Sequence, residues 1–273
     1  MRYVAIRSEG GLIPYDLLDK IANEDVPGQK PSDFGLSKGR RLTDEISRVW
    51  SDAQSLWDII RRRRESLSEK DPYGTTLTRD RWIVPLLSDA EMLGFDLKLQ
   101  ASALVLDNLT FNLSHRSGEG EDAIPIHVEG LKIDLDKRLH TKLRTSPQAM
   151  VQEFLNHSEV LWGLVTNGLT LRLLRNSSRT SRPTYIEFDL ESILEGNRFA
   201  EFAIFYRLCH RSRFPRLGQD PSECLLEKYY QQSIDEGSRV REGGRRAWQS
   251  GRASCGLAYR ASRRLACRLP VAS

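Results

Sequence analysis

Apolar residues recur every three or four positions between Thr43 and Arg64, and this spacing predicts a long helix with one buried face. The apolar positions of that face are Ile46, Val49, Trp50, Ala53, Leu56, Trp57 and Ile60. A second helix is predicted from Asp80 to Leu93, where the apolar spacing repeats and Gly94 supplies a stop signal. Helices therefore dominate the first third of the chain.

Shorter apolar runs, separated by Gly, Asp, Asn and Ser, then predict strands. These runs are Phe95–Leu99, Ala103–Leu106, Thr110–Leu113 and Ile124–Val128. The polar stretch 115–123 predicts a loop between the last two. Farther on, Ser146 followed by Pro147 has the form of a helix N-cap with proline at the first helical position, so we expect a helix over Gln148–Asn156.

The clearest local signal is Asn167-Gly168 between two apolar runs, residues 161–166 and 169–174. Asn-Gly favours a two-residue turn with both residues at positive φ, so this region should be a hairpin. One further strand is expected at Tyr185–Asp189, and helical segments at Leu190–Leu194, Phe199–Cys209 and Ser222–Ser233. The pattern predicts an α/β domain over residues 80–242, with a mixed sheet and flanking helices, preceded by an N-terminal helical segment over residues 1–79.

The net charge of +4 belongs to the end of the chain. Residues 243–273 contain seven arginines and no acid, and the remainder has 34 basic against 37 acidic residues. A second basic group, Arg61–Arg64, ends the long predicted helix. It is able to contact phosphate, but cations also complement the negative end of a helix dipole, which is the interpretation we favour.

Several classes of protein are disfavoured by the composition. Neither a signal peptide nor a run of about 18 apolar residues is found, so a cytoplasmic protein with no membrane partner is expected. The four cysteines, Cys209, Cys224, Cys255 and Cys267, form no C-x-x-C pair and have no histidine cluster nearby. A structural zinc site is therefore not expected, and we predict no metal or organic cofactor.

Three segments together resemble the N-terminal region of bacterial type IIG-like and phage-defence restriction-modification DNA adenine methyltransferases. They are residues 146–156, residues 161–168, which end in Thr-Asn-Gly, and residues 185–190. The stretches at 82–94, 111–116 and 226–229 agree with the same family, so the resemblance covers roughly residues 80–242. It implies a restriction-nuclease-like core and DNA as partner, with the methyltransferase region lying downstream. The glycine-rich loop for S-adenosylmethionine and the Asn/Asp-Pro-Pro-aromatic motif of methylation do not occur here.

A nuclease of that fold would need one acid, then an acid-x-Lys on a strand, so that two carboxylates hold Mg²⁺ and the lysine orients water. Asp96-Leu97-Lys98 has the local form, with Asp89 or Glu91 upstream at a short gap. Asp107 and Glu129 have a better gap, yet Lys132 lies three residues beyond Glu129, where a strand needs two. We expect a degenerate core kept for structure or DNA contact, with an active Mg²⁺-dependent endonuclease as the alternative.

Other candidate residues favour structural roles. His115 and His127 have no adjacent nucleophile or ligand set and are expected to form hydrogen bonds at strand ends. Asn167 and Gly168 are expected to serve mainly as turn residues.

Residues 243–273 are rich in Arg, Ala, Gly and Ser, with Gly243-Gly244 where relatives would continue a helix. This composition is typical of a GC-rich gene read out of frame, so an aberrant or disordered tail is expected, and a genuine nucleic-acid-binding arm is the alternative.

The resulting hypothesis is that the chain is a truncated fragment, the non-methylating N-terminal module of a restriction-modification or phage-defence methyltransferase, without catalysis of its own. Two rivals remain open. One is a Mg²⁺-dependent endonuclease domain, and the other is a standalone DNA-binding protein whose basic tail supplies the affinity.

Overall fold

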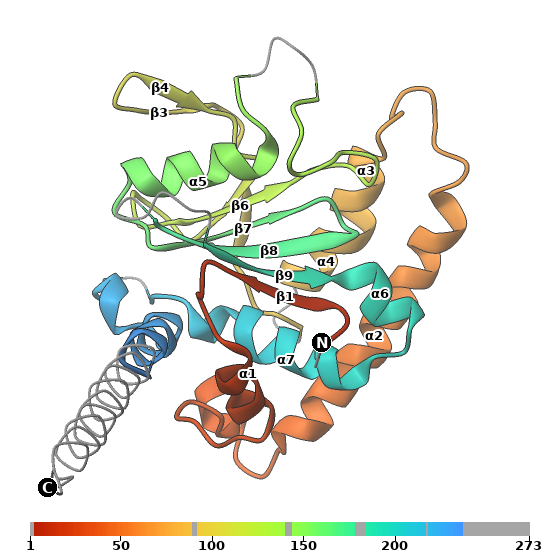
Figure 1. Cartoon of the computed structure of the whole chain (residues 1–273). Coiled ribbons are helices and arrows are strands. Elements are labelled where there is room, and N and C mark those ends of the chain that lie inside the picture. The colour runs from red at the N-terminus through yellow and green to blue at the C-terminus, as the bar shows by residue number, and fades with distance from the viewer. Residues whose placement is uncertain (1–2, 89–91, 140–143, 178–183, 217, 237–273) are drawn as a thin grey trace, which may run out of the picture. The chain divides into compact units, whose positions relative to one another are not determined.

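The centre of the protein is a seven-stranded mixed sheet with the strand order β1-β9-β8-β7-β6-β5-β2 (Figure 1). The computed structural model describes residues 3–88, 92–139, 144–177, 184–216 and 218–236. The strands are β1 (Ile6–Glu9), β2 (Leu97–Leu99), β5 (His115–Ser117), β6 (Ile124–Val128), β7 (Trp162–Thr166), β8 (Thr170–Arg175) and β9 (Tyr185–Asp189). Strands β3 (Leu104–Leu106) and β4 (Leu109–Phe111) form a separate hairpin. The predicted α/β class with a mixed sheet and flanking helices is confirmed.

One neighbouring pair of strands in the large sheet is parallel, and the other neighbours run antiparallel. In this pair, Ile126 of β6 faces Leu164 of β7. Because parallel neighbours need a crossover connection, the chain between them contains α5 (Pro147–His157). Helix α5 begins where the sequence predicts, since Ser146 Oγ accepts a hydrogen bond from the Ala149 N–H at 3.3 Å.

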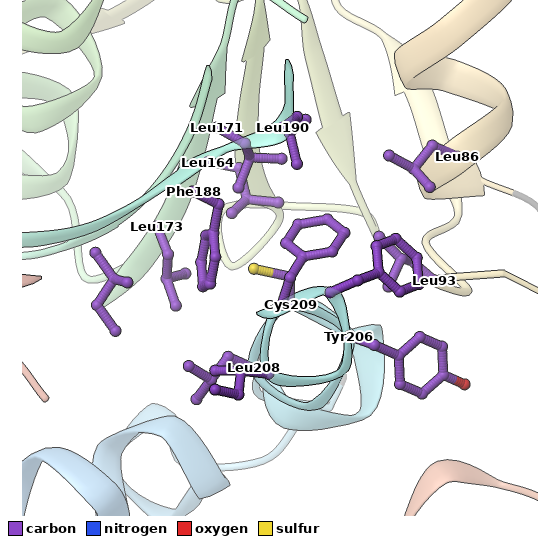
Figure 2. Close-up of a cluster of buried hydrophobic side chains, with 14 of the residues drawn as sticks. Leu86, Leu93, Leu164, Leu171, Leu173, Phe188, Leu190, Tyr206, Leu208 and Cys209 are labelled. Atoms are coloured by element: carbon purple, nitrogen blue, oxygen red, sulfur yellow. The ribbon is translucent and has the colours of Figure 1, made fainter. Parts of the chain in front are cut away.

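The two faces of the sheet carry separate apolar cores, as the alternation of strand side chains requires. On one face Leu164 and Phe188 pack with α1 (Tyr15–Ala22), α2 (Leu42–Arg63) and α7 (Phe199–Cys209). Figure 2 shows Cys209 and Tyr206 of α7 among the leucines of this face. On the other face Val165 packs with α5 and the β3–β4 hairpin. His127, Glu129 and Arg172, discussed below, lie on this second face.

The remaining helical segments are short. They are η1 (Pro31–Phe34), α3 (Thr75–Thr78), η2 (Arg79–Ile83), α4 (Val84–Ser88), α6 (Leu190–Glu195), η3 (Arg211–Arg213) and η4 (Pro221–Glu223). Segment η2 is a π-turn between α3 and α4, so the expected helix over Asp80–Leu93 starts earlier and is interrupted; residues 89–91 lie outside the described residues. Residues 225–236 are also helical. No helix within the described ranges has the length and apolar character needed to cross a membrane.

The N-terminal segment is more than the helical extension that we expected. Strand β1 pairs with β9 at the edge of the sheet, and Ala5 and Val4 donate backbone hydrogen bonds to the Glu201 carboxylate at 2.7 and 3.4 Å. Helices α1 and α2 share the main core. One compact unit therefore runs from Met1 to Tyr230, with no boundary near residue 79. The predicted tail, residues 243–273, lies outside the described residues.

The Asn167-Gly168 hairpin forms, but with a different turn. Gly168 has φ +84°, whereas Asn167 is not at positive φ. The Asn167 side chain instead accepts the N–H groups of Leu169 and Thr170 at 3.1 and 2.9 Å and donates to the Ile133 carbonyl at 2.8 Å. Strand pairing ends at Thr166 and Leu171, so the loop has four residues. The turn is therefore closed by hydrogen bonds of the Asn167 side chain, and Asn167 does not need the positive φ that we expected.

The expected loop over 115–123 contains a strand that the polar sequence concealed. His115–Ser117 forms β5, which pairs with β2 on one side and β6 on the other. Its polar side chains His115 and Ser117 are buried. Because β5 lies between two strands, its backbone is satisfied by pairing even though its sequence lacks an apolar face.

Candidate functional site at the end of strand β6

The candidate site is built where β6 leaves the sheet. Ile126 and Val128 point into the main core, so His127 points to the opposite face. Glu129 follows directly after the strand, and its N–H donates to the Thr166 carbonyl of β7 at 2.8 Å. This bond extends the strand direction, so Glu129 and His127 lie on the same face.

His127 joins this strand end to the segment before β5. Its Nδ1 accepts the backbone N–H of Ser114 at 3.2 Å, and its Nε2 lies 2.9 Å from Glu129 Oε1. Since Nδ1 is an acceptor, the proton of the neutral ring is on Nε2 and is donated to the carboxylate. The Ser114 hydroxyl also accepts the Val128 N–H at 2.7 Å. The ring is thereby fixed in one tautomer and one orientation.

A hollow of about 240 Å³ opens beside this pair. Glu129 and His127 form one side of it, Asn112 another, and Met150 and Leu139 give it apolar surface. It lies at the N-terminal end of α5, because Ser146 and Pro147 also line it. Four different segments of the chain therefore meet at this point.

The acid that sequence analysis paired with Glu129 lies elsewhere. Asp107 is in the tight turn between β3 and β4, with φ +48°, and its carboxylate is 2.8 Å from Nδ1 of His157. His157 ends α5, whereas Glu129 is at the hollow beside the start of α5. The 11 residues of α5 span about 16 Å. Two carboxylates separated on that scale are not placed to ligate one Mg²⁺, whose ligand distances are about 2.0–2.1 Å.

The other candidate pair, Asp96 and Lys98, is at the exposed edge of the sheet. Lys98 Nζ is 2.7 Å from Glu119 and 3.4 Å from Asp96. The hydrogen bond to Glu119 raises the pKa of Lys98, and the neighbouring Asp96 adds to this shift. Both upstream acids considered with this pair, Asp89 and Glu91, lie outside the described residues. Within the described parts of the chain, no three His, Cys, Asp or Glu side chains are grouped as metal ligands would be.

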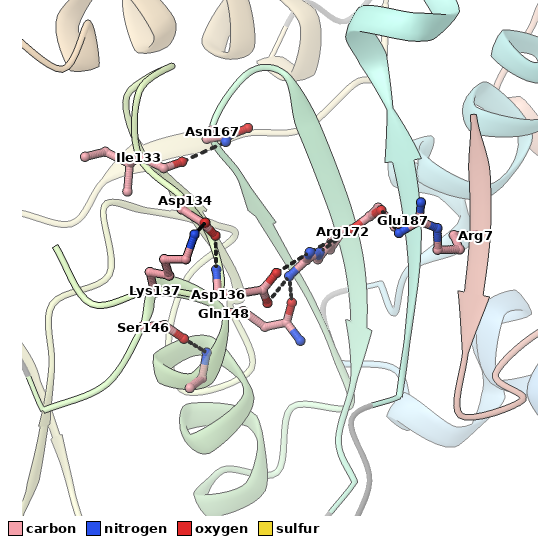
Figure 3. A network of polar contacts seen from close by, with 11 residues as sticks. Arg7, Ile133, Asp134, Asp136, Lys137, Ser146, Gln148, Asn167, Arg172 and Glu187 are labelled. Carbon is pink, nitrogen blue, oxygen red and sulfur yellow. Dashed lines mark hydrogen bonds and ion pairs between the residues drawn. The ribbon is translucent and has the colours of Figure 1, made fainter. Parts of the chain in front are cut away.

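A buried arginine joins the loop at Asp136 to the sheet (Figure 3). Arg172 of β8 makes a bidentate ion pair with Asp136 at 2.6 and 2.8 Å, and it binds Glu187 at 2.7 Å. It also contacts Gln148 of α5 and lies over the Tyr185 ring. Burial opposes the charge, but the hydrogen bonds to Asp136 and Glu187 outweigh it and keep the pKa of Arg172 above its ordinary value. This network orders residues around Asp136 against the sheet.

Sequence analysis did not anticipate the network, because its members come from three distant segments.

The two histidines considered in the sequence analysis, His115 and His127, are both buried and both hydrogen-bonded. Nδ1 of His115 is 2.9 Å from the Ser114 hydroxyl, and burial lowers the pKa of His115 to about 4. His115 is therefore neutral at pH 7.

Comparison of this chain with protein-family models, with curated proteins and with solved structures finds no match.

Proposed function

We propose that this chain is the N-terminal, non-methylating module of a DNA restriction-modification or phage-defence methyltransferase, and that it contacts DNA without cutting it. The resemblance of residues 80–242 to that family motivates the proposal, and the mixed sheet with flanking helices is compatible with the restriction-nuclease-like core that it implies. On this proposal, the methyltransferase region belongs to the parent enzyme.

One observation carries the non-catalytic part of the proposal. A metal-dependent nuclease needs a lysine two residues after the strand acid, on the same face. Two residues after Glu129 stands Leu131, which is buried in the main core and donates its N–H to Thr78 Oγ1 at 3.1 Å. The carboxylate of Glu129 is hydrogen-bonded to His127, and the carboxylate of Asp107 is hydrogen-bonded to His157. Both acids of this pair, Glu129 and Asp107, therefore have an imidazole partner where the nuclease chemistry would need a metal.

The DNA-contacting part is supported by cations at the end of α2. Arg63, Lys70 and Arg81 surround a hollow of about 580 Å³. All three side chains are exposed, and none has an acidic partner among the described residues. Two carboxylates also line this hollow: Asp71, which is engaged by three backbone N–H groups of α3, and the exposed Asp80. Such a group of free cations favours contact with phosphates.

The direct test is fluorescence anisotropy of labelled duplex DNA with the full chain at several salt concentrations. Each phosphate contact contributes about 0.9 to the slope of log K against log salt. Arg63→Ala, Lys70→Ala and Arg81→Ala should each lower that slope by roughly this amount. Lys38→Ala is the matched control, because Lys38 is exposed and precedes α2, whose 22 residues span about 33 Å.

Two outcomes would contradict the proposal. Mg²⁺-dependent cleavage of plasmid DNA by the purified chain would support the endonuclease instead. A salt slope that disappears on deletion of residues 243–273, but is unchanged in the three α2–α3 variants, would support the standalone DNA-binding protein with a basic arm.

A further inference from the structure

The hollow at Glu129 selects a hydrogen-bond donor. Glu129 supplies the only carboxylate among the described residues that line it. Its Oε1 is engaged by His127, whereas Oε2 has no hydrogen bond within the described part of the chain. The rim cation Arg144 is paired with Glu153 and does not neutralise Glu129. A phosphate would be repelled here, whereas an amine would find a free acceptor.

The remaining walls are partly apolar. Met150 and Leu139 present apolar surface, Phe111 and Pro147 are buried in the wall, and the exposed Asn112 amide has no hydrogen bond to the described residues. A volume of about 240 Å³ is several times the roughly 30 Å³ of a water molecule. Proteins that bind an unstacked base combine apolar or aromatic contacts with hydrogen bonds to the edge of the base.

We infer that this hollow binds a nucleobase with an exocyclic amine, adenine or cytosine, an inference that rests on the proposed contact with DNA. Glu129 Oε2 accepts the amine hydrogen, as carboxylates do from cytosine N4. Asn112 reads the adjacent ring edge, for which an amide has both a donor and an acceptor. His127 holds Glu129 in position, because its Nε2–H donates a hydrogen bond to Glu129 Oε1.

The test uses nucleosides, so that phosphate contacts do not contribute. Isothermal titration of the full chain with deoxyadenosine should show saturable binding, at least about tenfold tighter than with the purine deoxynucleoside that lacks the amine. Glu129→Gln should remove this preference and favour deoxyinosine, because an amide can donate to its carbonyl oxygen. Glu119→Gln is the matched control, since Glu119 is exposed and belongs to the Lys98 pair.

A second variant tests the inference independently, in case Glu129→Gln does not fold. Asn112→Ala changes an exposed side chain with no hydrogen bond in the described structure, so its circular dichroism spectrum should be unchanged. It should weaken deoxyadenosine binding about fivefold. Equal affinity for deoxyadenosine and its amine-free analogue, or no nucleoside binding at all, overturns the inference. If the chain still binds DNA with the expected salt dependence, the proposed function stands. Failure of the DNA assay overturns the proposed function, whatever the nucleosides do.

Discussion

Replacing Gly168 by alanine should destabilise the protein much more than an ordinary glycine substitution. Gly168 has φ +84°, and a Cβ built on it would lie 2.7 Å from Thr78 Cγ2, 3.1 Å from Trp82 Cδ1 and 3.2 Å from Leu131 Cδ2. The Gly168 carbonyl also accepts the buried Trp82 indole N–H at 2.7 Å. The substitution thus affects backbone conformation, packing and a buried hydrogen bond together.

The magnitude follows from these three terms. A non-glycine residue at positive φ costs about 1 kcal/mol, and overpacking costs about 1–3 kcal/mol. Displacing Trp82 weakens a buried hydrogen bond, which adds about 1 kcal/mol. The expected loss is about 3–5 kcal/mol, and at roughly 3 °C per kcal/mol the Tm should fall by about 10 °C. Gly168→Val should cost more, because a β-branched side chain is more restricted.

Thermal and urea unfolding followed by circular dichroism would measure the loss without using Trp82 as the reporter. Gly39→Ala is the matched control, because Gly39 has φ +92° and open space where a Cβ would be. It should cost only the conformational part, about 1 kcal/mol. If the two variants lose the same stability within about 0.5 kcal/mol, the crowding and hydrogen-bond reasoning is wrong.

Three further predictions concern buried charge and cofactor chemistry. Burial lowers the pKa of His210 from 6.5 to about 4, so its contribution is fully present above pH 6.5 and is lost as the pH falls toward 4. Acid should remove up to about 3 kcal/mol over that window, and His210→Gln should flatten the urea-midpoint profile against pH. Arg172→Met should destabilise by about 3–5 kcal/mol in urea unfolding, because the buried Glu187 loses its closest partner and keeps only the ion pair with the exposed Arg7 at 3.6 Å among the described residues. Asp136→Asn should cost about 1 kcal/mol, because Asp136 is more than half exposed. Calorimetry with S-adenosylmethionine should show no binding, and saturable binding at micromolar concentration would contradict the absence of the methylation motifs.

The parts of the fold that sequence analysis predicted well are governed by neighbouring residues. Ser146 and Pro147 specify the start of α5 with their own side chains, and the apolar run of β6 matches the structure at both ends. The hairpin at Gly168 was predicted for the same reason. The turn type was wrong because Asn167 bonds Ile133, a residue 34 positions away that no local pattern reveals.

The parts that were missed depend on pairing between distant segments. Strand β1 has one buried apolar residue, Ile6, and becomes a strand because β9 offers an edge. The candidate site was partly visible, since Glu129 and His127 were both considered. Their association with Ser114 required the register of β5 against β6, and the separation of Asp107 from Glu129 required the position of α5. Residue types indicated the chemistry available, but only the strand register determines which groups meet.

The pairing of β1 with β9 has a consequence for how the chain is made. The first strand, near Ile6, must wait for Tyr185–Asp189 before it has a neighbour to bond. At a synthesis rate of about 5–20 residues per second, that interval is about 10–35 s. During this time the apolar faces of α1 and α2 have left the ribosome without the sheet that covers them. The nascent chain therefore passes through a long stage in which chaperones can bind its N-terminal helices, and the sheet edge closes only when most of the compact unit has been synthesised.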